Sequence, residues 1–207
     1  LHLRFRRQRQ MCIRDRSGTT LSCYFNAVIP AFERLKQEGK IDHWGIGLGQ
    51  GEALIKAINY SKPPEAMQCA VNVLNSIGAI GYVNEKNDPN KILNECQNKN
   101  VPILAIRAVQ AGALTSFMDR KPHESGFDVE DFKDFEKALP FREYAKKVNE
   151  NPASLAHRYA LSQEKVSSVI LGVKNRKELL ECIKAESAGE LDKEMLANLN
   201  NLFKNMK

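Results

Sequence analysis

The sequence predicts an α/β fold in which parallel strands alternate with helices. Four short apolar runs are spaced along the chain, and each is followed by a segment whose apolar residues recur at helical spacing. Runs that are nearly continuous in apolar residues are typical of strands buried on both faces, as in a parallel sheet with helices packed outside it. A chain of 207 residues with 43% hydrophobic residues is long enough to bury a sizeable core in one domain.

The elements follow one another as one helix and then four strand–helix pairs. The predicted strands are residues 41–48, 66–73, 101–109 and 166–173. Helical spacing predicts a helix around Phe32 and another within residues 49–58. Capping patterns predict the starts of four later helices, at Asp88 before Pro89, Asn151 before Pro152, Asn175 with Glu178 as a capping box, and Asp192 with Leu191 and Leu196 as a hydrophobic staple.

Composition and charge exclude several classes of protein. No run approaches the roughly 18 apolar residues that a membrane span needs, and the chain opens without an apolar signal segment, so we expect a cytoplasmic protein with no membrane partner. Five of the six net positive charges come from residues 1–16, which hold six arginines and one aspartate and leave 25 basic against 24 acidic residues elsewhere. Nucleic acid is therefore not expected as a partner. We interpret residues 1–16 as an artefactual or disordered basic tail that resembles translated adapter sequence, with a genuine basic arm as the alternative, and residues 17–207 as the domain.

The cysteines and histidines do not predict a metal site. The five cysteines are widely spaced, and three of them lie in apolar strand or helix patterns, which favours reduced core residues over metal ligands. The four histidines lie in unrelated segments without the spacing of metal ligands.

The last predicted strand runs into a turn that can hold a phosphate. The free N–H groups and positive dipole end of the helix near Asn175 favour an anion, Gly172 permits close backbone approach, and Lys174 adds a charge. An ordinary strand-to-helix turn with a solvated lysine is the alternative. A phosphate held near the last strand is typical of the (β/α)8 barrel, which the alternating elements also fit.

The connection from Gln110 to Phe135 is polar and shows no strong period. Loops of this length are often functional, although a disordered insertion would have the same composition.

Five stretches, in this order, carry a resemblance to a known family. They are FERLKQEGKIDHWGIGLG (32–49), PPEAMQCAVNVLN (63–75), ILAIRAVQAGALT (103–115), SLAHRYALS (154–162) and SVILGVKNRKELLE (168–181). Over residues 27–205 the chain resembles the C-terminal part of an aldo/keto reductase, a NAD(P)H-dependent (β/α)8-barrel oxidoreductase. The resemblance implies that the four predicted strands are the fifth to eighth of the barrel, and hence that the fold is an incomplete (β/α)8 TIM-type barrel.

The same resemblance implies contacts with the nicotinamide half of the cofactor. Gln68 matches the glutamine that bonds the nicotinamide carboxamide, although a strand glutamine on its own would indicate only a core hydrogen bond. Gly47 stands where many members have a serine for that carboxamide, and Ile106 where many have a tyrosine stacked on the ring. Arg107 follows at the pyrophosphate position, and an arginine inside an apolar run is expected to have a partner.

At the adenosine end the resemblance is mixed. Gly172 and Lys174 match positions near the ribose phosphate, which favours NADP. Glu178 falls where NADP-preferring members often have arginine, and its carboxylate opposes a 2′-phosphate unless it turns back onto its own helix end. We expect NADP as the cofactor, with NAD possible.

The catalytic residues of the family are not found in this chain. Members reduce carbonyls with a tetrad of Asp, Tyr, Lys and His from the first four strands and their loops. The resemblance therefore implies an oxidoreductase that reduces a small-molecule carbonyl to an alcohol, present here as a fragment that cannot donate the proton and is inactive alone. Two exposed sheet edges predict that the fragment self-associates. A non-catalytic nicotinamide-binding regulatory subunit and a phosphate-binding barrel of another family are the alternatives.

Overall fold

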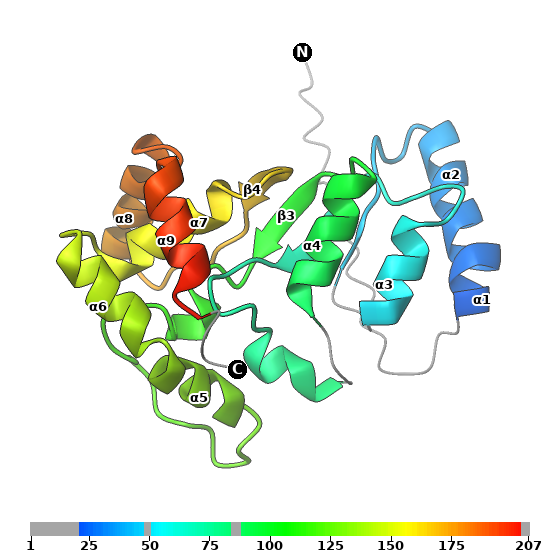
Figure 1. The fold of residues 1–207 in the computed structure, drawn as a ribbon. Coiled ribbons are helices and arrows are strands. Elements are labelled where there is room, and N and C mark those ends of the chain that lie inside the picture. The colour runs from blue at the N-terminus through cyan, green and yellow to red at the C-terminus, as the bar shows by residue number, and fades with distance from the viewer. Residues whose placement is uncertain (1–20, 48–50, 84–87, 204–207) are drawn as a thin grey trace.

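A sheet of four parallel strands forms the centre of the structure, a computed structural model that describes residues 21–47, 51–83 and 88–203 (Figure 1). The strands are β1 (Ile46–Gly47), β2 (Met67–Ala70), β3 (Ile103–Ile106) and β4 (Val166–Val169), and they pair in the order β1-β2-β3-β4. All three pairings are parallel, with one register shift between β3 and β4. The predicted α/β class is confirmed. The interpretation of residues 1–16 as a tail falls outside the described residues.

Each strand is shorter than its apolar run. Strand β3 ends at Ile106 because Arg107 has a φ of +59°, a left-handed backbone that cannot continue a strand. Apolar residues beyond the strand ends, such as Val73 and Ala108, are still buried. The apolar pattern therefore overstates the length of the strands, because it responds to burial and not to pairing.

The helices alternate with the strands as predicted. Before β1, helix α1 (Leu21–Cys23) continues through a π-helical segment (Tyr24–Val28) into α2 (Ile29–Gln37). Helix α3 (Gly51–Ile58) follows β1, and α4 (Pro89–Asn98) follows β2. The remaining helices are α5 (Val129–Lys137), α6 (Leu139–Lys147) and α7 (Pro152–Leu161) between β3 and β4, then α8 (Arg176–Ser187) and α9 (Lys193–Asn201) after β4. Within the described ranges, no helix has the length and apolar character needed to cross a membrane.

All four predicted caps are present. In each case the side-chain oxygen accepts a hydrogen bond from a backbone N–H in the first turn of the helix, which satisfies one of the groups that a helix end leaves open. The pairs are Asp88 with Asn90, Asn151 with Ser154, Asn175 with Glu178 and Asp192 with Met195.

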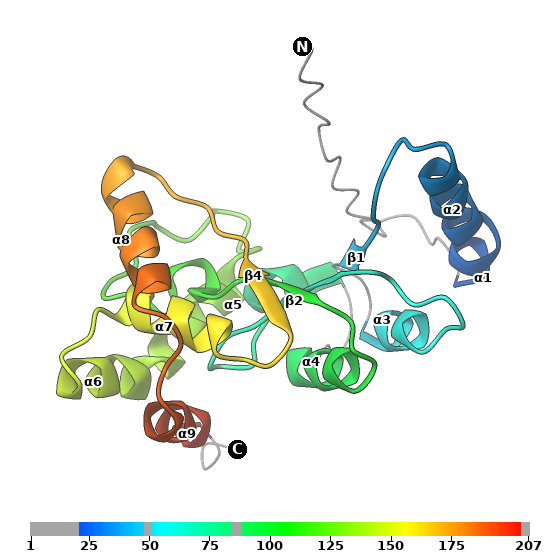
Figure 2. The ribbon, with the colours of Figure 1, turned by 90° about the horizontal axis from the view of Figure 1, so that it is seen from above.

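Two clusters of buried side chains fill the structure. The first core cluster joins one face of β1, β2 and β3 to α2, α3 and α4, with Met67, Ile103 and Cys96 essentially inaccessible. Figure 2 shows α3 and α4 together on that side of the sheet. The second core cluster joins α6, α7 and α9 around Phe141 and Leu155. Helix α9 packs on this second cluster through the buried Leu199.

The sheet has β1 and β4 at its two edges. Helices α2 and α8 lie at opposite ends of the sheet (Figures 1 and 2). The β4 end carries a group of exposed apolar side chains, which are Ile170, Leu171, Val173, Leu179, Leu180 and Ile183. We call these six residues the α8 apolar surface.

Candidate cofactor-binding site

The carboxyl ends of the parallel strands carry most of the residues that the sequence predicts to hold a cofactor. Gly47 is the last residue of β1, and Ile106 is the last residue of β3, followed directly by Arg107. Gly172 and Lys174 lie in the turn between β4 and α8. In sheets of this class, ligands bind at the carboxyl ends of the strands.

Gly47 and Gln68 are neighbours in register across β1 and β2. A side chain at position 47 would not fit, because its Cβ would lie 2.5 Å from the Cβ of Gln68 and 3.1 Å from its Oε1. The glycine that stands in place of the usual serine therefore leaves room for the glutamine. Among the described residues none hydrogen-bonds the Gln68 amide, so the structure does not support its interpretation as a core hydrogen-bonder. A half-buried amide that is available to donate and accept fits a carboxamide ligand.

Gln68 and Ile106 share the face of the sheet that α3 and α4 leave uncovered. Successive side chains in a strand point to opposite faces, and Cys69 and Ala105, which flank them in sequence, are buried in the first core cluster. Gln68 and Ile106 are both only half-buried. This face offers an amide and, one strand away, an aliphatic surface on which a flat ring can pack.

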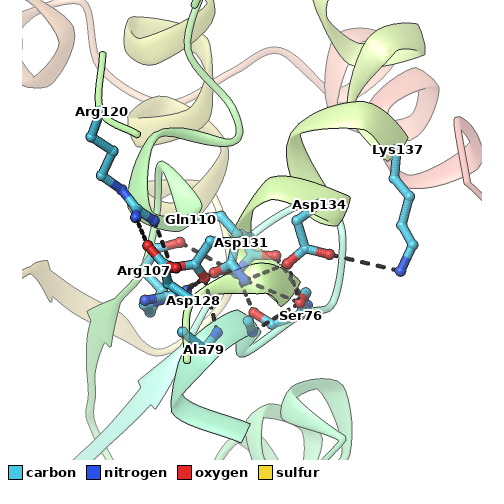
Figure 3. A network of polar contacts seen from close by, with 11 residues as sticks. Ser76, Ala79, Arg107, Gln110, Arg120, Asp128, Asp131, Asp134 and Lys137 are labelled. Atoms are coloured by element: carbon cyan, nitrogen blue, oxygen red, sulfur yellow. Dashed lines mark hydrogen bonds and ion pairs between the residues drawn. The ribbon is translucent and has the colours of Figure 1, made fainter. Parts of the chain in front are cut away.

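Arg107 has the buried partner that its place in an apolar run requires. Its Nη2 forms an ion pair with Oδ1 of Asp131, and its Nε donates to Oε1 of Gln110 at 3.0 Å (Figure 3). The side chains of Arg107 and Asp131 are 15% and 4% exposed. Asp131 belongs to α5, so the contact joins the carboxyl end of β3 to the helix at the C-terminal end of the long connection.

Two further aspartates extend this network: Asp128, the residue before α5, and Asp134 within the helix. Arg120 pairs with both Asp128 and Asp131, and Asp134 accepts from Ser76 Oγ at 2.5 Å and from Gln110 Nε2 at 2.7 Å (Figure 3). A backbone N–H bond from His123 and the Arg120 guanidinium hold the pKa of Asp128 below its usual range. We call Arg107, Gln110, Arg120, Asp128, Asp131, Asp134 and Ser76 the arginine–aspartate network.

The backbone around this network is strained. Asn75, Arg107, Gln110 and Ala111 all have positive φ, at +51°, +59°, +46° and +50°. Non-glycine residues rarely adopt this left-handed region, which costs about 1–2 kcal/mol per residue and is frequent at functional sites. The segments that follow β2 and β3 are thus held in left-handed backbone conformations by the contacts that surround them.

The start of α8 is partly occupied by the protein's own carboxylate. Glu178 Oε2 accepts from the backbone N–H of Lys174 at 2.7 Å, and its Oε1 accepts from Asn175 Nδ2 at 3.0 Å. Glu178 therefore turns back onto its own helix end, as the capping-box pattern permits. Lys174 pairs with Asp119 in the long connection, and this pairing lowers the pKa of Asp119. Gly172 is exposed, with open space where a Cβ would stand.

The structure assembles these residues into two groups and not one. Gly47, Gln68 and Ile106 lie on β1, β2 and β3, and Arg107 directly follows β3, whereas Gly172, Lys174 and Glu178 lie beyond the edge strand β4. Both groups are contacted by residues 110–135, through Asp131 and Asp119 respectively.

The long connection is more ordered than its sequence predicts. Residues 110–135 include a 3₁₀ turn (Gln110–Gly112) and the first part of α5, so the prediction of an aperiodic loop is wrong at its C-terminal end. The buried face of α5 is the polar one, with Asp131 and Asp134 inside while Val129 is exposed. Apolar periodicity does not detect such a helix, although the Asp spacing of three residues from 128 to 134 was a visible signal.

No group of three or more His, Cys, Asp or Glu side chains within the described ranges could hold a metal ion. One histidine and one cysteine do approach each other, with His157 Nε2 3.6 Å from Cys182 Sγ between α7 and α8. Burial lowers the pKa of His157 and raises that of Cys182. Both groups therefore favour their neutral forms.

The family model named Aldo/keto reductase family matches residues 14–204. The chain belongs to the aldo/keto reductase family. This confirms the resemblance drawn from the five sequence stretches. A search of curated protein sequences gave no match.

Solved aldo/keto reductases share the fold. An aldo-keto reductase from Bacillus halodurans in its holo form superposes with a TM-score of 0.64 at 20% identity, covering 89% of this chain and 58% of that one. A glycerol dehydrogenase from Gluconobacter oxydans gives 0.61 at 19% identity, covering 83% and 52%. A thermostable aldo-keto reductase with the inhibitor epalrestat gives 0.57 at 18% identity, covering 84% and 53%. The chain spans about half the length of these structures.

Proposed function

We propose that this chain binds NADP(H) for the reduction of a small-molecule carbonyl to an alcohol. The observation that supports the proposal most directly is the position of Gln68, Arg107 and Lys174. They lie in or just beyond three parallel strands, towards the carboxyl edge, in a chain of the aldo/keto reductase family. An amide, a guanidinium and an ammonium in this order suit a carboxamide, a pyrophosphate and a ribose phosphate.

Each residue has a definite task in this proposal. Gln68 orients the nicotinamide through its amide, Gly47 makes room for that amide, and Ile106 packs on the ring. Arg107 donates to the pyrophosphate. The cofactor itself supplies the hydride, so these residues bind and orient.

The preference for NADP depends on the start of α8. Lys174 adds a positive charge beside the ribose position, with its side chain 61% exposed and paired to Asp119. Glu178 is already bonded to the Lys174 N–H and to Asn175, so its carboxylate points at its own helix end. Lys174 favours NADP, whereas the Glu178 carboxylate at this helix end opposes the 2′-phosphate, so we propose NADP with NAD as the alternative.

Proton donation requires residues that this sequence does not include. The Asp, Tyr, Lys and His of the family tetrad have no matching positions in residues 27–205. We propose that the 207-residue chain alone does not reduce carbonyls, since loss of a general acid typically lowers rates by ~10²–10⁴-fold. We further propose a cytoplasmic location, with neither nucleic acid nor a membrane as partner.

The second candidate function is a nicotinamide-binding subunit that regulates and does not catalyse. Family membership and the proposed binding residues are equally consistent with a reductase and with such a subunit. The two differ in whether the full protein carries the catalytic tetrad. Sequencing the reading frame upstream of codon 17 decides between them: an Asp, Tyr, Lys and His set at family spacing supports the reductase. The third alternative, a phosphate-binding barrel of another family, receives no support from the family match.

Cofactor binding is tested by fluorescence titration with NADPH, using the longest reading frame that encodes this chain. Lys174→Ala and Arg107→Ala should each weaken binding by about tenfold, since charge-assisted hydrogen bonds contribute on the order of 1.5 kcal/mol or more. Lys133→Ala is the matched control, because Lys133 is an exposed lysine of α5 whose one ion pair among the described residues is with the exposed Glu130. Unchanged affinity in both test variants would refute the assignment.

A further inference from the structure

The guanidinium of Arg107 is held along one side and open along the other. Its Nε is bonded to Gln110 and one Nη2 hydrogen to Asp131, whereas no described residue accepts from Nη1. The side chain is 15% exposed, so part of it still reaches solvent. The planar group therefore presents a fixed edge with two unused N–H donors, which is the geometry that binds a phosphate oxygen pair.

Asp131 is an anchor that cannot easily move. Its Oδ1 also accepts the backbone N–H of Ala79 at 2.9 Å, and its Oδ2 accepts Arg120 Nη2 at 2.9 Å. The carboxylate is 4% exposed, and Gly78 beside it has no room for a Cβ. A buried carboxylate that accepts three hydrogen bonds has a fixed orientation, so it also fixes the orientation of the Arg107 guanidinium.

The arginine–aspartate network has no surplus positive charge. It contains two guanidinium groups and three carboxylates, with Lys137 Nζ at its rim, 3.9 Å from Asp134 Oδ1. Arg107 therefore cannot attract an anion through net charge in the way an isolated cation does. It can instead bind an anion through guanidinium N–H groups whose orientation is already fixed before the ligand binds.

We propose that Asp131 is a positioning residue that aims Arg107 at the cofactor pyrophosphate. The inference rests on the proposed function and adds to it that a residue of α5 orients the Arg107 side chain. In this arrangement Gln110 and Asp131 hold one side of the fork, and Nη1 donates to phosphate. Asp131 touches no part of the ligand.

The test compares NADPH affinity in Asp131→Asn, Arg107→Lys and Arg107→Ala. Asp131→Asn should weaken binding about tenfold, and Arg107→Lys should lose as much as Arg107→Ala, because a lysine cannot bond Gln110 and Asp131 and still present a free edge. Glu130→Gln, which removes an exposed carboxylate from the same helix, should stay within twofold of the parent. In the Arg107→Ala background, Asp131→Asn should have no further effect, whereas a merely structural role would add its loss again.

A measurement without cofactor separates this inference from the proposed function. The Nη2–H resonances of Arg107 should exchange slowly with solvent in the parent and in Glu130→Gln, and rapidly in Asp131→Asn, because Nη2 donates to Asp131 whereas Nε donates to Gln110. If the parent binds no NADPH, the proposed function fails and this inference with it. If the parent binds NADPH while Asp131→Asn binds equally well, the positioning role is overturned and the proposed function stands. The same holds if Arg107→Lys keeps full affinity, or if the Nη2–H resonances exchange equally fast in the parent and in Asp131→Asn.

Discussion

Gly78 is the residue on which the packing of the arginine–aspartate network depends most directly. It has a φ of +49°, and a Cβ there would overlap Asp131 Oδ1, Arg107 Nη2 and Gln110 Nε2. A side chain at this position would force apart three groups that are bonded to one another. The glycine is thus required both by its backbone angle and by the space around it.

Gly78→Ala should lower the melting temperature by more than the backbone angle alone explains. The left-handed backbone costs about 1–2 kcal/mol for alanine, and each kcal/mol corresponds to roughly 2–4 °C for a chain of this size. Gly126→Ala is the matched control, because Gly126 has a φ of +69° with open space around it. Calorimetry should show a clearly larger fall for Gly78→Ala, and equal falls would contradict the crowding.

His157 should make stability depend on pH in the mildly acidic range. Burial lowers its pKa in the folded state, whereas the unfolded chain titrates near the ordinary value of about 6.5. Below that pH the unfolded state binds more protons, so the free energy of unfolding falls as the pH falls, until the folded-state pKa is reached. Urea unfolding at pH 7.5 and pH 5.5 should show this loss, and His157→Asn should reduce it. His43→Asn, at an exposed histidine, should leave the loss of stability between pH 7.5 and pH 5.5 unchanged.

Elements whose signals are local could be predicted from the sequence, and those that depend on distant partners could not. The four helix caps are correct because a cap is made within three residues. Helix α5 was missed because its buried face is polar and is balanced by arginines from β3 and the connection, a match that no periodicity contains. In the same way the family pattern located Arg107, but its partner 24 residues away emerges only from the fold.

At the start of α8, we propose that Glu178 influences the balance between NADP and NAD. Its carboxylate bonds the Lys174 N–H at 2.7 Å, so a negative charge stands at the end of the helix where the 2′-phosphate is proposed to lie. Glu178→Gln keeps a hydrogen-bonding side chain but removes that charge. It should raise the ratio of NADPH to NADH affinity several-fold, since exposed charge interactions contribute up to about 1 kcal/mol.

Fluorescence titration with both cofactors measures this ratio. Glu181→Gln, one turn of the same helix away from the capping contacts, is the control and should leave the ratio unchanged. An unaltered ratio in Glu178→Gln would mean that the 2′-phosphate is not bound at this helix end.

For the molecule as a whole, the α8 apolar surface and the two edge strands predict self-association. Leu179, Leu180 and Ile183 are 43%, 46% and 50% exposed, next to an edge strand whose outer backbone groups have no described strand beside them. Strand edges beside apolar side chains readily pair with another chain. The 207-residue chain should therefore be larger than a monomer at micromolar concentration.

Analytical ultracentrifugation of Ile183→Glu tests the surface responsible. This variant should shift the chain towards the monomer, whereas Leu139→Glu, which alters an equally exposed leucine on α6, should not. A compact monomer in the parent chain would contradict the prediction and would imply that another contact covers the edges.

The division of the interior into two core clusters has a consequence for how the molecule opens. The first cluster packs α2, α3 and α4 against the sheet and includes Ala160 of α7. The second cluster packs α6, α7 and α9 against one another. Regions with separate cores exchange their amide hydrogens in separate cooperative steps. The amides of α9 and α6 should thus become accessible together, before those of β2 and β3. Because the arginine–aspartate network joins β3 to α5 between the two clusters, a ligand that tightens it should slow exchange in both regions at once.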